Sequence, residues 1–213
     1  MARQVITINR RKYAVGLMWQ PIGAAVNARN YEHSLARGIN RHFNLFVEYR
    51  AMVGLGASRT GMRVGMNSAA AEVMDAFSEY TSFIAVFRVP AGFYLVAARN
   101  GIILQDKLFD KENEAREEYV KLTEIPDWGA FFAPDSWGMP RAIERDLTAL
   151  LGGRSRIFLR PISHFRAGLF SLILLGGFVL LATGIFRDSI LQTMMPRPQV
   201  HELNPELVAE YKR

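Results

Sequence analysis

FIAVFRVPAGFYLVAARNGIIL, residues 83–104, contains three short apolar runs separated by two turn signals. Pro90-Ala-Gly92 ends the first run, and Asn100-Gly101, between the second and third, is a strong signal for a two-residue hairpin. Short consecutive strands joined by tight turns favour antiparallel pairing. The stretch therefore predicts a three-stranded antiparallel meander.

The segments on either side of the meander have helical periodicity. Residues 68–80 predict an amphipathic helix whose apolar positions are Ala70, Val73, Met74 and Phe77, with Glu72, Asp75 and Glu79 facing water. Residues 111–122 predict a second helix with a buried stripe of Ala115, Tyr119 and Leu122. A brief strand is expected at 130–132, a third helix at 140–151, and a last strand at 157–159.

The sequence of residues 4–66 predicts mainly β-strands. We expect strands at 4–10, 13–19, 43–55 and 62–66, a polar turn at 10–12, and a helix at 27–40. Strands followed by alternating helices and strands indicate an α+β or mixed α/β domain. We assign this domain to residues 1–160.

Residues 167–186 contain no charged side chain, and twenty apolar residues are enough for a helix to cross about 30 Å of hydrocarbon. We therefore expect one transmembrane helix there, after a basic juxtamembrane linker at 161–166. The arginines expected at the membrane surface are Arg154, Arg156, Arg160 and Arg166. Their excess predicts a cytoplasmic N-terminus and a short tail at 187–213 on the other side of the membrane.

Composition limits the chemistry that the chain can perform. There is no cysteine, so disulfides, thiol chemistry and cysteine-based metal sites are excluded. The formal net charge is +6, and residues 1–60 hold nine lysines and arginines against two glutamates. Beside a membrane anchor, this excess of positive charge predicts attraction to anionic lipid headgroups or to an acidic partner. Binding to nucleic acid is not expected, because the chain has no motif that recognises nucleic-acid bases.

A glycine-rich stretch, Gly54–Gly65, is the candidate nucleotide site. Gly56-Ala-Ser-Arg-Thr-Gly61 has the spacing that opens a phosphate-binding loop, but Met62 and Arg63 stand where such a loop needs lysine and serine or threonine. We interpret these glycines as a turn and keep phosphate binding as an alternative. The sequence indicates no nucleophile–base arrangement, so we expect no catalytic residue, no cofactor and no enzyme.

Metal binding is not expected either. The four histidines, His33, His42, His164 and His201, show no metal-ligand spacing. The acidic residues Asp106, Asp110, Glu112, Glu114, Glu117 and Glu118 lack the pattern of a calcium loop and are interpreted as a solvated helix face.

An aromatic loop follows the second predicted helix. Its large side chains are Trp128, Phe131, Phe132 and Trp137. They either fill the core of the domain or form part of a protein-docking surface, since tryptophan is enriched at interface hot spots.

Several blocks resemble the PilO-type pilin accessory proteins of type IVb pilus systems. They are Tyr13–Gln20 (YAVGLMWQ), the block 92–104, and the run formed by Asp127-Trp128, Ala133-Pro134, Trp137 and 147–151. The resemblance implies a bitopic inner-membrane protein of the pilus assembly platform, with the short tail at 187–213 in the periplasm. Its cytoplasmic domain would be similar in plan to the cytoplasmic part of the GspL and PilM group, which resembles an actin-like half-domain. Longer members carry a sizeable domain after the span, whereas 27 residues follow it here.

We therefore expect a non-enzymatic scaffold in a multi-protein complex. Its implied partners are the assembly ATPase and a polytopic inner-membrane platform protein. Two alternatives stay open: an inner-membrane component of a type IV secretion or conjugation apparatus, and a membrane-anchored nucleotide-binding module that uses Gly54–Gly65.

Overall fold

The predicted meander forms the central sheet of the structure, a computed structural model that describes residues 4–22, 31–152 and 157–162. Its strands are β7 (Ser82–Val89), β8 (Gly92–Arg99) and β9 (Ile102–Phe109), all antiparallel, with β10 (Ala130–Phe132) parallel to β7 at the other edge. Asn100 and Gly101 have φ of 51° and 78°, as a primed hairpin turn requires. The meander is therefore confirmed.

Two further sheets are built mainly from the N-terminal part. One has the order β1-β2-β6, with β1 (Val5–Ile8), β2 (Arg11–Ala14) and β6 (Asn67–Ser68). The other has the order β11-β4-β5-β3, with β3 (Met18–Pro21), β4 (Leu45–Tyr49), β5 (Met52–Gly56) and β11 (Arg160–Pro161). The domain is thus mixed α/β with three sheets.

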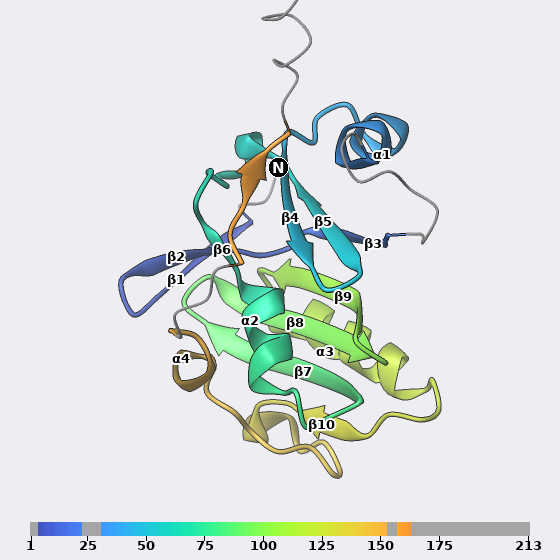
Figure 1. Cartoon of the computed structure of the whole chain (residues 1–213). Coiled ribbons are helices and arrows are strands. Elements are labelled where there is room, and N and C mark those ends of the chain that lie inside the picture. The colour runs from blue at the N-terminus through green and yellow to red at the C-terminus, as the bar shows by residue number, and fades with distance from the viewer. Residues whose placement is uncertain (1–3, 23–30, 153–156, 163–213) are drawn as a thin grey trace, which may run out of the picture. The chain divides into compact units, whose positions relative to one another are not determined.

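Helices cover both faces of the central sheet (Figure 1). The helices α2 (Ala69–Ala76) and α4 (Leu147–Leu150) contact one face, and α3 (Glu112–Thr123) contacts the other. Alternate residues of β7 and β8 therefore enter two separate apolar clusters, as the pleat of a strand requires. The helix α1 (Tyr31–Ile39) contributes the buried Ala36 to a third, smaller cluster.

Several predicted elements are corrected by the structure. The strand expected at 13–19 is divided between β2 and β3, and that expected at 43–55 is a hairpin of β4 and β5. The turn near residue 10 uses Asn9 and Arg10, both with positive φ. Residues 62–66 contain no strand, and the helix expected at 140–151 is limited to α4, so Ile143 is exposed.

The predicted fold class also needs correction. It combined the α/β domain, compared with an actin-like half-domain, with one transmembrane helix. Among the described residues, no helix is long and apolar enough to cross a membrane: α3 has 12 residues, about 18 Å of helix, and is rich in charge. The span predicted at 167–186 and the tail at 187–213 lie outside the described residues. Residues Met1–Ser163 form one compact unit with the three sheets.

Candidate functional site

Two glycines of the predicted loop lie inside a strand. Gly54 and Gly56 belong to β5, which is paired on both sides, with β4 and with β3. A Cβ on Gly54 would lie 3.0 Å from the Trp19 ring, and one on Gly56 would lie 2.5 Å from the Met62 sulfur. Close side-chain packing therefore explains these glycines, and the interpretation of them as a turn is wrong.

The residues that follow β5 do not form a nucleotide-binding P-loop. Ser58–Thr60 is a single turn of 3-10 helix that ends at Gly61, with φ of 94°. The next helix, α2, starts only at Ala69, and Met62 is buried. A P-loop leads directly into a helix and offers a lysine to the phosphates, and neither feature is present in this segment.

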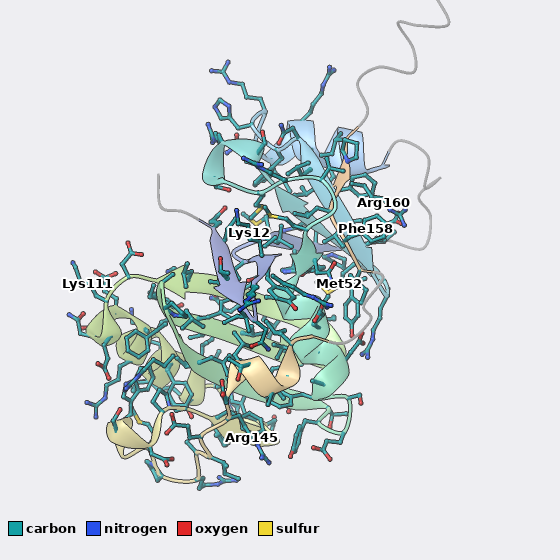
Figure 2. The ribbon with its side chains drawn as sticks, turned by 90° about the vertical axis from the view of Figure 1, so that its left-hand side faces the viewer. Lys12, Met52, Lys111, Arg145, Phe158 and Arg160 are labelled. Carbon is teal, nitrogen blue, oxygen red and sulfur yellow. The ribbon has the colours of Figure 1, made fainter. Side chains whose placement is uncertain are left out.

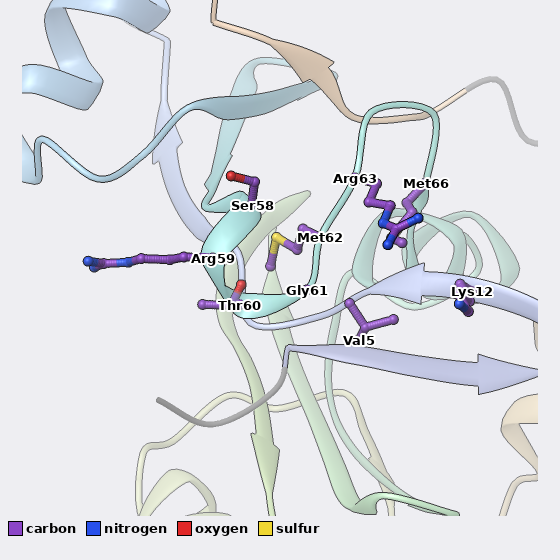
Figure 3. A pocket seen from close by; sticks show the side chains of 9 residues that line it. All are labelled: Val5, Lys12, Ser58, Arg59, Thr60, Gly61, Met62, Arg63 and Met66. Carbon is purple, nitrogen blue, oxygen red and sulfur yellow. The ribbon is translucent and has the colours of Figure 1, made fainter.

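A polar pocket of about 520 Å³ nevertheless lies beside this segment (Figure 3). It is lined by the β1–β2 hairpin through Val5 and Lys12, and by the segment 58–66. Its cationic lining residues are Lys12, Arg59 and Arg63, and no carboxylate is among the residues that line it. The arrangement is therefore suited to an anion.

A buried carboxylate connects the central sheet to the N-terminal strands. Asp106 on β9 accepts hydrogen bonds through Oδ1 from the Gly16 N–H at 2.7 Å and the Tyr94 hydroxyl at 2.9 Å. Its Oδ2 accepts from the Leu17 N–H at 3.1 Å and from Trp19 Nε1 at 2.9 Å. Both oxygens are satisfied, so the side chain is an organising element of the fold.

This residue was misassigned from the sequence, which grouped Asp106 with an exposed acidic face. The strand β9 continues to Phe109, and Asp106 lies on its inner side, opposite Val96. The flanking residues give no local signal of this burial, because Leu104, two positions before Asp106, is 51% exposed. Burial raises the pKa of Asp106 above its ordinary value of 3.8, although its four hydrogen bonds act in the opposite direction.

Glu72 is a second buried carboxylate that the sequence placed in water. It accepts a hydrogen bond from Asn67 Nδ2 at 2.6 Å and another from the Gly152 N–H at 3.3 Å. The two contacts join the start of α2 to the segment after α4. Tertiary partners thus turn this side chain inward, which helical periodicity alone cannot predict.

The aromatic loop packs largely into the core against α3. Trp128 and Trp137 are buried in the cluster beside α3, and Phe131 is half-buried there. Phe132 is buried in the cluster on the other face of the sheet, stacked on Phe77. Trp128 Nε1 donates to the Leu122 carbonyl at 2.8 Å, and the Trp137 ring contacts the Tyr119 ring edge-on. The core role is therefore observed, and docking of a partner through this loop stays a prediction.

Of the four arginines predicted for a membrane surface, Arg160 lies within the described residues. Its guanidinium is 3.7 Å from Glu48 and lies over the Phe158 ring, 5.6 Å from the centroid (Figure 2). Arg154, Arg156 and Arg166 lie outside the described residues. Within the part that the structure describes, no group of three or more histidine or acidic residues could hold a metal ion.

Comparison with known proteins gives a fold and no sequence family. No family model matches the chain, and no curated protein matches it. A solved structure with a similar fold is the crystal structure of the cytoplasmic domain of BfpC, with a TM-score of 0.60. The likeness covers 74% of this chain and 97% of that chain, at 15% sequence identity. It shows a shared fold.

Proposed function

We propose that this chain is a non-enzymatic scaffold of type IVb pilus assembly, and that its three-sheet domain docks the assembly ATPase and neighbouring platform proteins. The observation that carries the proposal is the fold shared with the cytoplasmic domain of BfpC, over almost the whole of that domain. BfpC is a type IVb pilus biogenesis protein. The comparison points to a pilus-related domain and does not favour the PilO type in particular.

The use of the buried polar groups supports a scaffold. Asp106 and Glu72 are the two carboxylates of the described residues that are buried, and each is hydrogen-bonded within the domain. Groups held in this way stabilise one arrangement of the strands and helices. A rigid domain of this kind presents fixed surfaces to partners, which is what an assembly platform requires of a scaffold.

The proposal is tested by affinity purification of the full-length protein from its own cells in mild detergent, followed by quantitative mass spectrometry. We expect recovery of an assembly ATPase together with a polytopic platform protein. The control is a tagged chain that begins at residue 164 and so lacks the three-sheet domain. It should lose the ATPase, because the proposal assigns ATPase docking to that domain.

Other results would change or overturn the proposal. Recovery of conjugation or effector-secretion components would support a scaffold role but would assign the protein to a machine other than a pilus. Recovery of the protein alone would contradict a scaffold. Equal recovery of the ATPase with the chain that starts at residue 164 would contradict docking through the three-sheet domain.

A further inference from the structure

The segment 58–66, which forms one wall of the polar pocket, is held by hydrogen bonds to Gln4, Asn44 and Leu159. The Gln4 N–H donates to the Thr60 carbonyl at 3.1 Å, which ties the segment 58–66 to the residue that precedes the strand β1. Leu159 exchanges hydrogen bonds with this segment, donating to Met66 and accepting from Gly65, at 2.8 and 2.9 Å. Because the backbone of this segment is held in place before any ligand arrives, little backbone conformational entropy is lost on binding.

The other end of the segment is also anchored. Asn44 forms two hydrogen bonds to Ser58: its Oδ1 accepts from the Ser58 N–H at 2.8 Å, and its Nδ2 donates to the hydroxyl at 2.7 Å. Met62 is buried beneath the segment against Gly56. The segment is therefore a fixed part of the domain, although it contains no regular strand.

The cationic side chains of the pocket have no carboxylate partner in the described part of the chain. The ion pairs there involve Arg50, Lys111 and Arg160, and none involves Lys12, Arg59 or Arg63. In Figure 3, the side chains of Arg63 and Lys12 lie on the same side of the pocket, whereas the side chain of Arg59 extends away from them. Lys12 and Arg63 are thus the pair of charges best placed to act on one ligand.

Backbone donors accompany these charges. The N–H groups of Met62 and Arg63, both on the lining segment, donate to no acceptor among the described residues. Charged donors and backbone N–H groups together are the combination that proteins use to hold phosphate.

We propose that this pocket binds a phosphate-bearing anion, a role that goes beyond the scaffold function. The volume of about 520 Å³ lies within the range of small-molecule sites. No aromatic side chain lines the pocket, so a nucleobase would find no stacking surface, and the recognised group is the phosphate itself. Such a phosphate is carried either by a free soluble anion or by a lipid headgroup.

The experiment uses the purified full-length protein and two probes. Inorganic pyrophosphate is titrated by calorimetry at low ionic strength, because salt screens these contacts. Sedimentation then compares phosphatidylcholine vesicles with and without phosphatidic acid. The test variant is K12Q/R63Q. The matched control is R37Q/K121Q, which removes two exposed positive charges outside the pocket.

We expect saturable binding that K12Q/R63Q weakens at least about tenfold and that R37Q/K121Q leaves nearly unchanged. Binding of pyrophosphate identifies a free anion as the source, and binding only of vesicles with phosphatidic acid identifies a headgroup. Absence of binding to both probes overturns the proposal, and so does equal weakening by the two double variants. If K12Q/R63Q fails to fold, the single variants K12Q and R63Q provide the same comparison, each with a smaller loss.

Discussion

Trp19 Nε1 donates a hydrogen bond to Asp106 Oδ2 at 2.9 Å, across 87 positions of the sequence. Trp19 belongs to β3, in the sheet completed by β4, β5 and β11, whereas Asp106 belongs to β9 at the edge of the central sheet. Because the same carboxylate also accepts from Gly16, Leu17 and Tyr94, one side chain joins two sheets and the segment between β2 and β3.

Replacement of Asp106 by asparagine should lower the free energy of unfolding by about 2–4 kcal/mol. One oxygen becomes an NH₂ group, which cannot accept the hydrogen bonds that converge on it, and buried donors are left without a partner. Urea unfolding of the full-length protein, followed by tryptophan fluorescence, measures the change. Asp110→Asn is the matched control, because Asp110 is exposed, and should stay within about 0.5 kcal/mol of the wild type. Equal midpoints for the two variants would contradict the role given to Asp106.

The raised pKa of Asp106 predicts how stability depends on pH. Between the ordinary value of 3.8 and the higher native pKa, the folded protein binds more protons at this group than the unfolded chain does. The contribution of Asp106 to the free energy of unfolding therefore falls as pH rises through this window, and is constant above it. Urea midpoints of the wild type and of Asp106→Asn, compared from about pH 3.5 to 7, isolate the contribution. A difference that grows with pH would show a lowered native pKa instead.

Two glycine-to-alanine substitutions should have opposite effects. At Gly54 the new Cβ would lie 3.0–3.1 Å from three atoms of the Trp19 ring, so Gly54→Ala should destabilise the protein by about 1–3 kcal/mol. At Gly38, in α1, a Cβ meets no atom within 4 Å among the residues described, and alanine favours a helix by up to about 1 kcal/mol. Thermal unfolding of both variants measures the two changes in stability. A stabilising Gly54→Ala would show that the indole can move aside.

The sequence predicted the elements whose signals are local. The meander follows from two tight-turn signals, and α3 follows from the spacing of Ala115, Tyr119 and Leu122, all of which are buried. The hairpin of β4 and β5 was missed because its turn uses Arg50, with φ of 51°, where no glycine or asparagine marks a reversal. The division of β2 from β3 occurs at Gly16, which has φ of 70° and carries a backbone N–H bound to Asp106.

The site was harder to predict because its residues meet only in the folded domain. Lys12 is separated from Arg63 by some fifty residues. The sequence placed Lys12 in a polar turn at 10–12, whereas it lies in β2, and the β1–β2 hairpin brings it to the pocket. The glycine pattern pointed to the segment that lines the pocket, but Gly54 and Gly56 themselves allow close packing inside the domain. The groups proposed to bind an anion are the cationic side chains of Lys12 and Arg63. Burial of Asp106 and Glu72 likewise depends on partners that are distant in sequence.

The aromatic loop offers a test that separates a core residue from a docking residue. Trp137 is buried, its Nε1 donates to Glu112 at 2.6 Å, and Arg116 donates to its carbonyl at 3.2 Å. Trp137→Ala should therefore lower the free energy of unfolding by about 3–5 kcal/mol. Phe131 is half-buried under the Arg141 guanidinium, 5.3 Å from the ring centroid, so Phe131→Ala should cost about 1 kcal/mol and leave the domain folded.

Capture of the assembly ATPase by the two full-length variants, at a temperature where both are folded, then tests docking. If the loop docks this partner, Phe131→Ala should reduce capture, because Phe131 is the member of the predicted aromatic set that keeps exposed surface. Trp137→Ala should capture the ATPase as the wild type does at this temperature, since the Trp137 ring faces the Tyr119 and Phe93 rings inside the domain. It should lose capture only under conditions that unfold the variant. Unchanged capture by Phe131→Ala would assign the loop to the core alone, and unchanged stability of Trp137→Ala would contradict the packing described for this indole.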